Sequence, residues 1–508
     1  MAYRSEFPPI CVALGYAERE RLDRAAAYAC DSGEEFLEIR LDMLEDPREG
    51  IGTIRRIKRR CPDVFLLATC RRKQNGGAFE GTIEEQLELL GAAIEAGAQA
   101  VDIEIETAGE APERVAALRE RAKVVVSYHN FQFTPPLAPV LRRLEKAPAD
   151  VYKLAAMARK PSDNCRLLDV ARRYQNHPLV VVGMGETGVP SRILSLSRHS
   201  AFTYAAPPCH PAEKSALPGT APGQLSSSLL HRQYRAVRHT CATAVYGVIG
   251  NPVRHSLSPA VHNRAFQARR IDAVYVPFLV EEGRLRDFFQ LAARLPVAGF
   301  SVTIPHKRRV LRHLDAVDPA ARRIGAVNTV YRRQGKLRGA NTDTAGVIAP
   351  LEKRLKLKNS KILIAGSGGA ARGAAFALAE KGAQVFLTGR NINRVRALAR
   401  ACGAEALEND RLAGRWFDVL VHATPLGMRP RTDECYFPDE IPAELVFDMV
   451  YNPLETLLLK KARAAGKAVI SGLEMFLEQA ALQFEIWTGT RAPRLAMETT
   501  AREVLETS

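Results

Sequence analysis

The hydrophobic and polar positions in the first half of the chain follow two alternating patterns. Short apolar, β-prone runs are separated by segments with apolar residues at i, i+3 and i+4, such as TIEEQLELLGAAIEAG. The runs are PICVALG, EFLEIRL, DVFLLATC, AVDIEIE, KVVVSYH, DVYKLAAM, LVVVGMG and AFTYAA. Eight strand–helix units predict an α/β fold with a (β/α)8 barrel. A doubly wound sheet is the alternative, although it would need only about six strands.

A different order of predicted strands and helices begins at Tyr246. The stretch YGVIGNPVRHSLSP contains an apolar strand, an Asn-Pro break and a helix start, with Ser258 expected at the N-cap and Pro259 at the first helical position. Further on, GAVNTVYRR and GKLRGANTDTAG form a hairpin-like pair. The run KILIA then leads directly into GSGGAARGAAFALAE, the strand, glycine turn and helix that are typical of a dinucleotide-binding Rossmann domain.

These patterns predict a chain of several parts. The predicted parts are a barrel at 1–235, a linker at 236–244, a substrate-binding domain at 245–345, a Rossmann domain at 346–470 and C-terminal helices at 471–508. The C-terminal helices are expected to return to the substrate-binding domain. In the barrel, the Pro-, Gly- and Ala-rich residues 206–222 are expected to form a mobile loop, and QLSSSLLHRQYRAV the last helix.

Composition narrows the class of protein. Apolar residues make up 46% and charged residues 25%, which is typical of a soluble globular protein. No apolar run approaches the roughly 20 residues of a membrane span, and no export signal is visible at the N-terminus. The nine cysteines are scattered and never spaced as CxxC. We therefore expect reduced thiols in the cytoplasm, with neither a disulfide framework nor a structural metal site.

The net charge of +16 raises the question of nucleic acid. Lys and Arg are spread over both halves among acidic residues, and no nucleic-acid motif occurs. A basic surface that favours small anionic substrates is the better interpretation. The sequence leaves the oligomeric state open.

Polar residues mark the expected carboxyl ends of the barrel strands, where barrel enzymes place their chemistry. These residues are Glu38, Arg40, Arg71, His129 and Lys153. A desolvated lysine near other cations has a lowered pKa and can attack a carbonyl group to form a Schiff base. Taken alone, Lys153 could equally be a solvent-facing lysine at a strand end, and His129 a packed histidine.

The motifs EIRLD, SYHN, YKLA, Ser191-Arg192 and TAPGQ occur in this order. Together they resemble type I 3-dehydroquinate dehydratase over roughly residues 5–235. The resemblance implies that Lys153 forms an imine with the substrate ketone and that His129 is the general acid and base. It implies that the substrate is held by Glu38, Arg40, Arg71, Arg192, Thr220 and Gln224. Arg192 suits a carboxylate, because its guanidinium can bind both oxygens.

The chain departs from this family at two positions. Asn75, in RRKQNGG, stands where the family usually has a glutamate that supports the catalytic histidine. Loss of that charge would lower the pKa of the imidazole relative to a carboxylate-paired one, although an amide can still orient the ring. Thr220 replaces a serine that is common there and keeps the hydroxyl. Activity is therefore expected, with a shifted pH profile.

In the second half, Lys307 and Asp343 both end strands and could meet at one sheet edge as an acid/base pair. An ordinary surface ion pair is the alternative. The second Rossmann strand, QVFLTGR, ends where NAD enzymes usually carry an acidic residue. Here that place holds Arg390, followed by Asn391 and Arg394, which would attract a 2′-phosphate. The expected cofactor is therefore NADP.

The motifs SLSP, GFSVTIPHK, GAVNT, NTD, GSGGAAR, HATPLGM, FDMVYNP and GLEMFLEQA occur in one order. This series resembles shikimate dehydrogenase, which reduces 3-dehydroshikimate with NADPH. The resemblance implies that Lys307 and Asp343 are catalytic. It implies substrate contacts from Ser256, Ser258, Thr303, Asn328, Tyr451 and Gln479. The expected cofactor contacts are Gly366, Ser367, Gly368, Gly369, Ala370, Arg390, Asn391, Arg394, Thr424, Met449 and Gly472.

The two serines, Ser256 and Ser258, are expected to hold the substrate carboxylate. Ser301 stands where many bacterial members of the family have asparagine, which puts one substrate contact in doubt. The two resemblances together predict two consecutive steps, since the product of the dehydratase is the substrate of the dehydrogenase. The alternatives are a second half that acts mainly on quinate, and a chain in which one half is a non-catalytic scaffold.

Overall fold

The structure is a computed structural model that describes residues 6–208 and 219–507. The chain divides into two compact units, residues 1–245 with 272–297, and residues 246–271 with 298–508. Most of the loop predicted at 206–222 lies outside the described residues.

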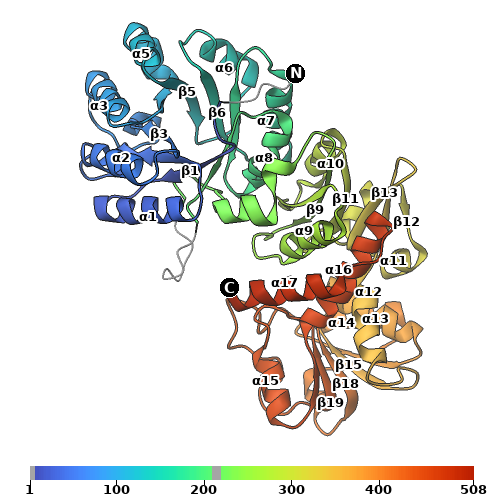
Figure 1. Ribbon diagram of the computed structural model, residues 1–508. Coiled ribbons are helices and arrows are strands. Elements are labelled where there is room, and N and C mark those ends of the chain that lie inside the picture. The colour runs from blue at the N-terminus through green and yellow to red at the C-terminus, as the bar shows by residue number, and fades with distance from the viewer. Residues whose placement is uncertain (1–5, 209–218, 508) are drawn as a thin grey trace. The chain divides into compact units, whose positions relative to one another are not determined.

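The first unit contains the predicted barrel (Figure 1). Its eight strands follow the order β7-β6-β5-β4-β3-β2-β1-β8, and the pairs are parallel, so that the sheet curls into a nearly closed barrel. The strands are β1 Ile10–Leu14, β2 Phe36–Arg40, β3 Phe65–Thr69, β4 Ala100–Glu104, β5 Lys123–Asn130, β6 Val151–Met157, β7 Leu179–Met184 and β8 Thr203–Ala205. All eight predicted strands are confirmed.

Aromatic rings fill the amino end of the barrel. Phe36 and Phe65 begin β2 and β3, and their ring centroids lie 5.1 Å apart. Phe7 lies 5.0 Å from Phe65 and 5.3 Å from Phe202, which precedes β8. Because these large apolar rings pack together at the amino ends of the strands, the polar side chains further along the strands gather at the opposite end.

The helices of the first unit surround the strands (Figure 1). They are α1 Arg19–Asp31, α2 Glu49–Arg60, α3 Ile83–Glu95, α4 Ile105–Glu110, α5 Pro112–Arg119, α6 Leu137–Leu144, α7 Pro161–Arg173 and α8 Val189–Leu194. Residues 272–297 supply β10 Ala273–Leu279 and α10 Leu285–Arg294. The backbone and hydroxyl of Ser162 on α7 donate to Asp287 on α10 at 2.8 and 2.6 Å, which joins this segment to the barrel helices.

The helix predicted from QLSSSLLHRQYRAV is only partly formed. Residues 227–233 are helical, mostly as a π-helical turn at Leu229–Gln233, and a 3₁₀ turn follows at Ala236–Arg238. Ser226 forms a strand-like bridge with Ala206, so the helix begins only after it, and Arg235, with a φ of 49°, interrupts the helix before its predicted end.

The second unit begins with the substrate-binding part predicted from Tyr246. Strands β9, β11, β13, β14 and β12 lie in this order in a mixed sheet, and β13 pairs antiparallel with β14, which confirms the hairpin. The elements are β9 Ala244–Gly250, α9 Ser258–Arg269, β11 Val297–Val302, β12 Ala316–Val317, α11 Pro319–Ile324, β13 Thr329–Arg333 and β14 Lys336–Ala340.

The Rossmann sheet is parallel, with the order β17-β16-β15-β18-β19-β20. Its strands are β15 Lys361–Ala365, β16 Gln384–Thr388, β17 Glu405–Ala406, β18 Phe417–His422, β19 Ala443–Asp448 and β20 Ala468–Ile470. Its helices are α12 Asp343–Glu352, α13 Gly369–Glu380, α14 Ile392–Cys402 and α15 Leu457–Ala464. The apolar residues of β15 and β18 form its core with the alanine-rich α13.

The chain ends with α16 Gly472–Thr488 and α17 Arg494–Thr507. Gln483 on α16 accepts a hydrogen bond from Ser301 at 2.8 Å, and the indole of Trp487 donates to the carbonyl of Val330 at 3.0 Å. The C-terminal helix α16 therefore contacts the sheet that contains β11 and β13.

Among residues 6–208 and 219–507, no helix combines the length and apolar character needed to cross a membrane. In the same residues, no group of three or more His, Cys, Asp or Glu side chains is arranged to hold a metal ion. The described cysteines are free thiols.

Candidate active sites

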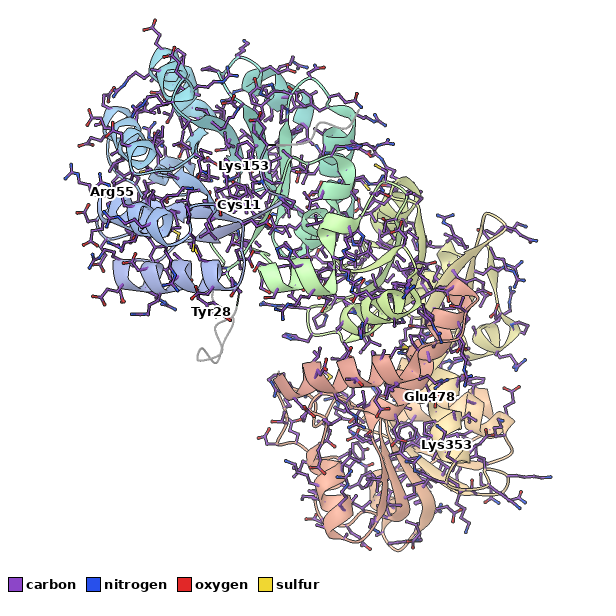
Figure 2. The ribbon with its side chains drawn as sticks, viewed as in Figure 1. Cys11, Tyr28, Arg55, Lys153, Lys353 and Glu478 are labelled. Carbon is purple, nitrogen blue, oxygen red and sulfur yellow. The ribbon has the colours of Figure 1, made fainter. Side chains whose placement is uncertain are left out.

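Lys153 lies inside the barrel on β6, with 6% of its side chain exposed (Figure 2). Its ammonium nitrogen lies 2.8 Å from a carboxylate oxygen of Asp102 on β4 and 2.9 Å from the hydroxyl of Tyr204 on β8. The same nitrogen lies 4.0 Å from the centroid of the Tyr204 ring. A buried lysine held by groups from two other strands is not a solvent-facing residue, so the alternative interpretation of Lys153 is excluded.

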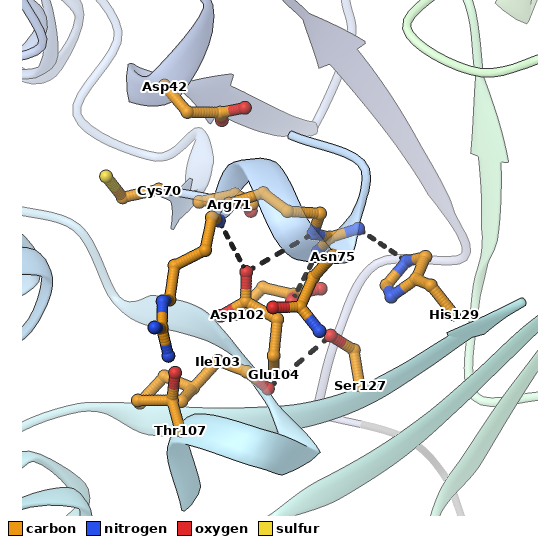
Figure 3. A network of polar contacts seen from close by, with 12 residues as sticks. Asp42, Cys70, Arg71, Asn75, Asp102, Ile103, Glu104, Thr107, Ser127 and His129 are labelled. Carbon is orange, nitrogen blue, oxygen red and sulfur yellow. Dashed lines mark hydrogen bonds and ion pairs between the residues drawn. The ribbon is translucent and has the colours of Figure 1, made fainter. Parts of the chain in front are cut away.

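Asp102 connects the lysine to a second cation (Figure 3). Its carboxylate accepts hydrogen bonds from Arg71 and from the hydroxyl of Ser127, both at 2.6 Å. Burial opposes ionisation of Asp102, but the charges of Lys153 and Arg71 outweigh it and hold the pKa of that carboxyl well below its usual range. The carboxylate therefore stays ionised at neutral pH.

His129 lies at the end of β5, and its Nε2 contacts the guanidinium of Arg71 (Figure 3). Its ring stacks on Phe131 with centroids 6.0 Å apart. Burial lowers the pKa of His129 well below 6.5, and the charges of Arg71 and Lys153 lower it further. The imidazole is therefore neutral at physiological pH and is joined to Lys153 through Arg71 and Asp102.

Asn75 is held by a carboxylate from the next strand–helix unit. Its Nδ2 donates to Glu106 at 3.0 Å. The following residue, Gly76, packs so closely on Phe131 that an added Cβ would lie 2.2 Å from its ring. The loop that carries Asn75 thus supports the ring on which His129 stacks.

Arg192 on α8 is 1% exposed and has no acidic partner among the described residues. One Nη donates to the carbonyl of Pro222 at 3.0 Å, whereas Nε and the other Nη have no partner in the described part of the chain. Burial lowers the pKa of this guanidinium to about 10. Since a buried, uncompensated cation is costly, the arrangement fits a site that receives an anion.

The other predicted substrate residues of the barrel form local pairs. Glu38 accepts a hydrogen bond from Thr69 at 2.7 Å, and Arg40 binds both carboxylate oxygens of Asp42 at 2.9 and 2.7 Å. Arg40 is already neutralised by Asp42, so Arg192 is the better candidate for the principal anion site.

Thr220 and Gln224 lie just after the undescribed loop. The hydroxyl of Thr220 donates to the side-chain oxygen of Gln224 at 3.4 Å. Pro222, between them, carries the carbonyl that Arg192 contacts. These two residues therefore lie on the segment next to the proposed anion site.

Asp102, Tyr204 and Asp42 were not predicted from the sequence. In AVDIEIE the acidic residues alternate with apolar ones, as in a strand with one solvated face, and Tyr204 resembles an ordinary core aromatic. The geometry of a barrel could have indicated Asp102. Alternate residues of a strand share one face, so Asp102 and Glu104 lie on one side of β4, as Glu38 and Arg40 do on β2.

The predicted catalytic pair of the second half is formed. The ammonium of Lys307, in the turn after β11, lies 2.6 Å from a carboxylate oxygen of Asp343, the first residue of α12. Asn328 donates to the other oxygen of Asp343 at 2.8 Å and lies 3.5 Å from the side-chain oxygen of Gln479. Because the Lys307 and Asp343 side chains are only 18% and 7% exposed, this is not an ordinary surface ion pair.

The carboxyl end of β9 carries the two predicted serines. The hydroxyl of Ser256 accepts a hydrogen bond from the backbone N–H of Ser258 at 3.3 Å. Ser258 is the first helical residue and Leu257 is the N-cap, so the predicted N-cap at Ser258 is wrong by one residue. Gly250, at the end of β9, approaches Thr303 so closely that an added Cβ would lie 2.4 Å from its methyl group.

Tyr451 follows β19 and is positioned by α16. Its ring lies 5.2 Å from that of Phe476, which is on the same face of α16 as Gln479. Burial raises the pKa of the Tyr451 hydroxyl, so it remains a neutral hydrogen-bonding group.

The residues present fit a dinucleotide. Gly366 has a φ of 133°, and an added Cβ would lie 2.7 Å from the carbonyl oxygen of Ala423, so only glycine is tolerated at this turn. Gly368 is the N-cap of α13, whose N-terminus attracts phosphate. Gly369 lies beside Lys307, since an added Cβ would be 3.6 Å from the lysine side chain. The glycine turn at 366–369, which would hold the cofactor phosphates and is called the phosphate loop below, therefore lies next to the Lys307–Asp343 pair.

The remaining predicted cofactor residues lie along the same edge of the sheet. Ser367 is in the glycine turn, Ala370 in the first turn of α13, Thr424 after β18, Met449 after β19, and Gly472 at the start of α16. Arg390 and Arg394 are exposed beyond β16, and Asn391 caps α14 by accepting the backbone N–H of Arg394 at 3.1 Å.

Four family models match separate stretches of the chain, in both of its halves. Residues 10–240 match Type I 3-dehydroquinase, and residues 248–330 match the Shikimate dehydrogenase substrate binding domain. Residues 350–425 match Shikimate / quinate 5-dehydrogenase, and residues 472–502 match the Shikimate 5′-dehydrogenase C-terminal domain.

Individual relatives match one or both halves. The shikimate dehydrogenase (NADP(+)) of Methanosarcina acetivorans is 43% identical over 277 residues, which cover 52% of this chain and 99% of that protein. A solved Thermus thermophilus shikimate 5-dehydrogenase in complex with NADP(H) and shikimate has 37% identity and a TM-score of 0.49, covering 52% of this chain and 100% of that one. The chloroplastic bifunctional 3-dehydroquinate dehydratase/shikimate dehydrogenase of Arabidopsis thaliana is 36% identical over 512 residues, which cover 96% of this chain and 83% of that protein. With both halves matched in one relative, the chain belongs to the family of bifunctional 3-dehydroquinate dehydratase/shikimate dehydrogenases.

Proposed function

We propose that the barrel dehydrates 3-dehydroquinate to 3-dehydroshikimate and that the second half reduces this product to shikimate with NADPH. The observation that carries the proposal is the buried connection of Lys153 to His129 through Asp102 and Arg71. It places an amine and a neutral imidazole in one site, as a Schiff-base dehydratase requires.

In the dehydratase, the nitrogen of Lys153 attacks the substrate ketone. The two protons that its ammonium gives up leave with the ketone oxygen as water, and an iminium ion remains. Neutral His129 then removes a proton from the carbon next to the iminium carbon, which leaves an enamine. The protonated imidazole returns that proton to the departing hydroxyl, so that water leaves and a conjugated iminium ion forms. Hydrolysis of this ion releases the product and restores the ammonium of Lys153. Arg192 would hold the substrate carboxylate throughout.

In the dehydrogenase, bound NADPH would supply a hydride to the ketone carbon. Lys307 lies next to the phosphate loop and supplies the proton to the ketone oxygen. Asp343 holds the lysine ammonium, and Asn328 orients Asp343. Ser256 and Ser258 would bind the carboxylate, while Thr303, Tyr451 and Gln479 complete the proposed substrate site.

The preference for NADP is proposed from Arg390, because a cation beyond β16 would bind the ribose 2′-phosphate. Replacing Arg390 with alanine is expected to weaken NADPH binding by roughly 10- to 100-fold, the loss typical of a charged hydrogen-bonding partner, with little effect on NADH. Arg396→Ala is the matched control, since Arg396 is on the same helix as Arg394 and pairs with Glu408. Titration of the two cofactors measures the effect, and equal losses for both would contradict the assignment.

The pH dependence of dehydration follows from His129. Because burial, and then the charges of Arg71 and Lys153, lower the pKa of His129, the neutral base persists as the pH falls through 6.5. The acid limb of kcat/KM is therefore expected below pH 6.5. Asn75→Glu, which adds a carboxylate to the supporting loop, should move that limb to higher pH, whereas Asn75→Gln should not. An acid limb above pH 6.5 in the unaltered enzyme would overturn the prediction.

Quinate is a second candidate substrate of the dehydrogenase half, because residues 350–425 match a family named for both shikimate and quinate. Turnover of the two compounds with NADP⁺ and NAD⁺ would decide between them. The alternative in which the barrel is only a scaffold predicts no borohydride-trapped adduct with 3-dehydroquinate. A cytoplasmic location is proposed from the scattered cysteines, and cell fractionation tests it.

A further inference from the structure

A buried histidine and aspartate lie at the carboxyl edge of the Rossmann sheet. His422 ends β18 and Asp448 ends β19, and the two residues are directly paired in the sheet. Their side chains are 1% and 0% exposed, and His422 Nδ1 lies 2.8 Å from Asp448 Oδ1. Neither residue takes part in the reactions proposed above.

The contacts of Asp448 determine which ring nitrogen carries the proton. Its carboxylate also accepts hydrogen bonds from the backbone N–H of Val450 at 3.0 Å and from the hydroxyl of Thr456 at 2.6 Å. An ionised carboxylate only accepts, so His422 Nδ1 must be the donor. The tautomer with its hydrogen on Nδ1 presents Nε2 as an acceptor.

The acceptor nitrogen faces the loop that follows β18. His422 Nε2 lies 2.5 Å from the hydroxyl of Thr424, which therefore donates its hydrogen to the ring. The backbone N–H of Leu426 donates to the same hydroxyl at 3.3 Å. These two contacts fix the orientation of the Thr424 hydroxyl. Its hydrogen is donated to His422, and its remaining lone pair can accept another hydrogen bond.

The pair lies beneath the part of the site where the nicotinamide half of the cofactor would bind. Gly366 lies at the end of β15, and Arg390 follows β16, so the adenosine half belongs on the β16 side. The other half then lies over β18 and β19, beyond the point where the strand order reverses. Val450, whose N–H donates to Asp448, packs closely against Gly472. A Cβ added to Gly472 would lie 2.4 Å from the carbonyl oxygen of Val450.

We propose that His422 and Asp448 are positioning residues for the nicotinamide carboxamide. They hold the Thr424 hydroxyl as a hydrogen-bond acceptor for an amide N–H of the cofactor. The inference rests on the proposed NADPH-dependent reduction and adds a specific ligand group to it: a primary amide, recognised through its donor.

The test uses the full chain, NADPH, and the NADPH analogue in which an acetyl group replaces the carboxamide and so has no N–H to donate. His422→Asn keeps a donor near the position of Nδ1, next to Asp448, but lacks the acceptor that orients Thr424. We expect it to weaken NADPH binding by about 10-fold, the loss typical of one well-oriented hydrogen bond, while binding of the acetyl analogue changes little. Dehydratase turnover in the same chain is the internal control and should not change.

Equal weakening of both cofactors, or no weakening of either, in a folded His422→Asn variant overturns the proposal. If that variant does not fold, Thr424→Ala and Thr424→Ser decide. The serine variant should bind NADPH more tightly than the acetyl analogue, as the unaltered chain does. The alanine variant should bind the two cofactors equally. A chain that binds NADPH without any preference over the acetyl analogue also contradicts the inference. A chain that does not oxidise NADPH with 3-dehydroshikimate contradicts the proposed function instead.

Discussion

Lys153→Ala is expected to lower dehydratase turnover by about 10⁴-fold or more, because the variant has no amine to form the imine and the loss of a nucleophile removes the whole covalent route. NADPH-dependent reduction of 3-dehydroshikimate, for which we propose Lys307 and Asp343 as the catalytic pair, should be unaffected. Two activities in one chain therefore provide an internal measure of correct folding. Separate assays with each substrate measure both.

The matched control is Lys153→Arg, which keeps a cation next to Asp102 but cannot form a Schiff base. It should be as inactive as the alanine variant, whereas a purely electrostatic role for Lys153 would leave the arginine variant substantially active. Borohydride reduction in the presence of 3-dehydroquinate, followed by mass analysis, should place a covalent adduct on Lys153. An active enzyme without that adduct would contradict the imine route.

The barrel could be predicted from sequence because several of its strands, such as β1, β3 and β7, are apolar on both faces, as strands covered by helices are. Lys153 attracted notice for the same reason, since a charged residue within an apolar strand needs a partner or a function. The helix after β8 was predicted too long because hydrophobic periodicity contains no information about tertiary pairing. Ser226 pairs with Ala206 in a bridge, and Arg235 adopts a left-handed conformation. Both effects depend on residues distant in the sequence or on local backbone strain.

The predicted sites lacked residues whose role depends on side chains that come from other strands. Asp102 looked like a solvated position of an alternating strand, but the curvature of the barrel places it between Lys153 and Arg71. His422 was part of the motif HATPLGM, yet nothing in that motif shows that Asp448, 26 residues later, is its partner. In contrast, Lys307 and Asp343 could be paired from sequence because each lies in the short segment after a recognisable strand, β11 and β14 respectively.

In the second half, Lys307→Ala is expected to lower the turnover of 3-dehydroshikimate by about 10²- to 10⁴-fold, the range typical of a lost general acid, with NADPH binding retained. The fold should tolerate the change, because Asp343 keeps the hydrogen bond from Asn328 at 2.8 Å and is not left without a partner. The atoms of Lys307 nearest to Gly369 belong to its aliphatic stem, so we expect alanine to remove packing at this point of the glycine turn.

Lys307→Met is the matched control for that packing, since it retains most of the aliphatic stem without the ammonium. If the proton donor is the ammonium, the methionine and alanine variants should have equally low kcat, while the methionine variant keeps the NADPH affinity of the unaltered chain. If Lys307 acts only by packing against the phosphate loop, methionine should restore turnover. Steady-state kinetics with separate cofactor titrations distinguishes the two. Loss of the proton donor lowers kcat in both variants, whereas loss of packing alone would weaken NADPH binding in the alanine variant and not in the methionine variant.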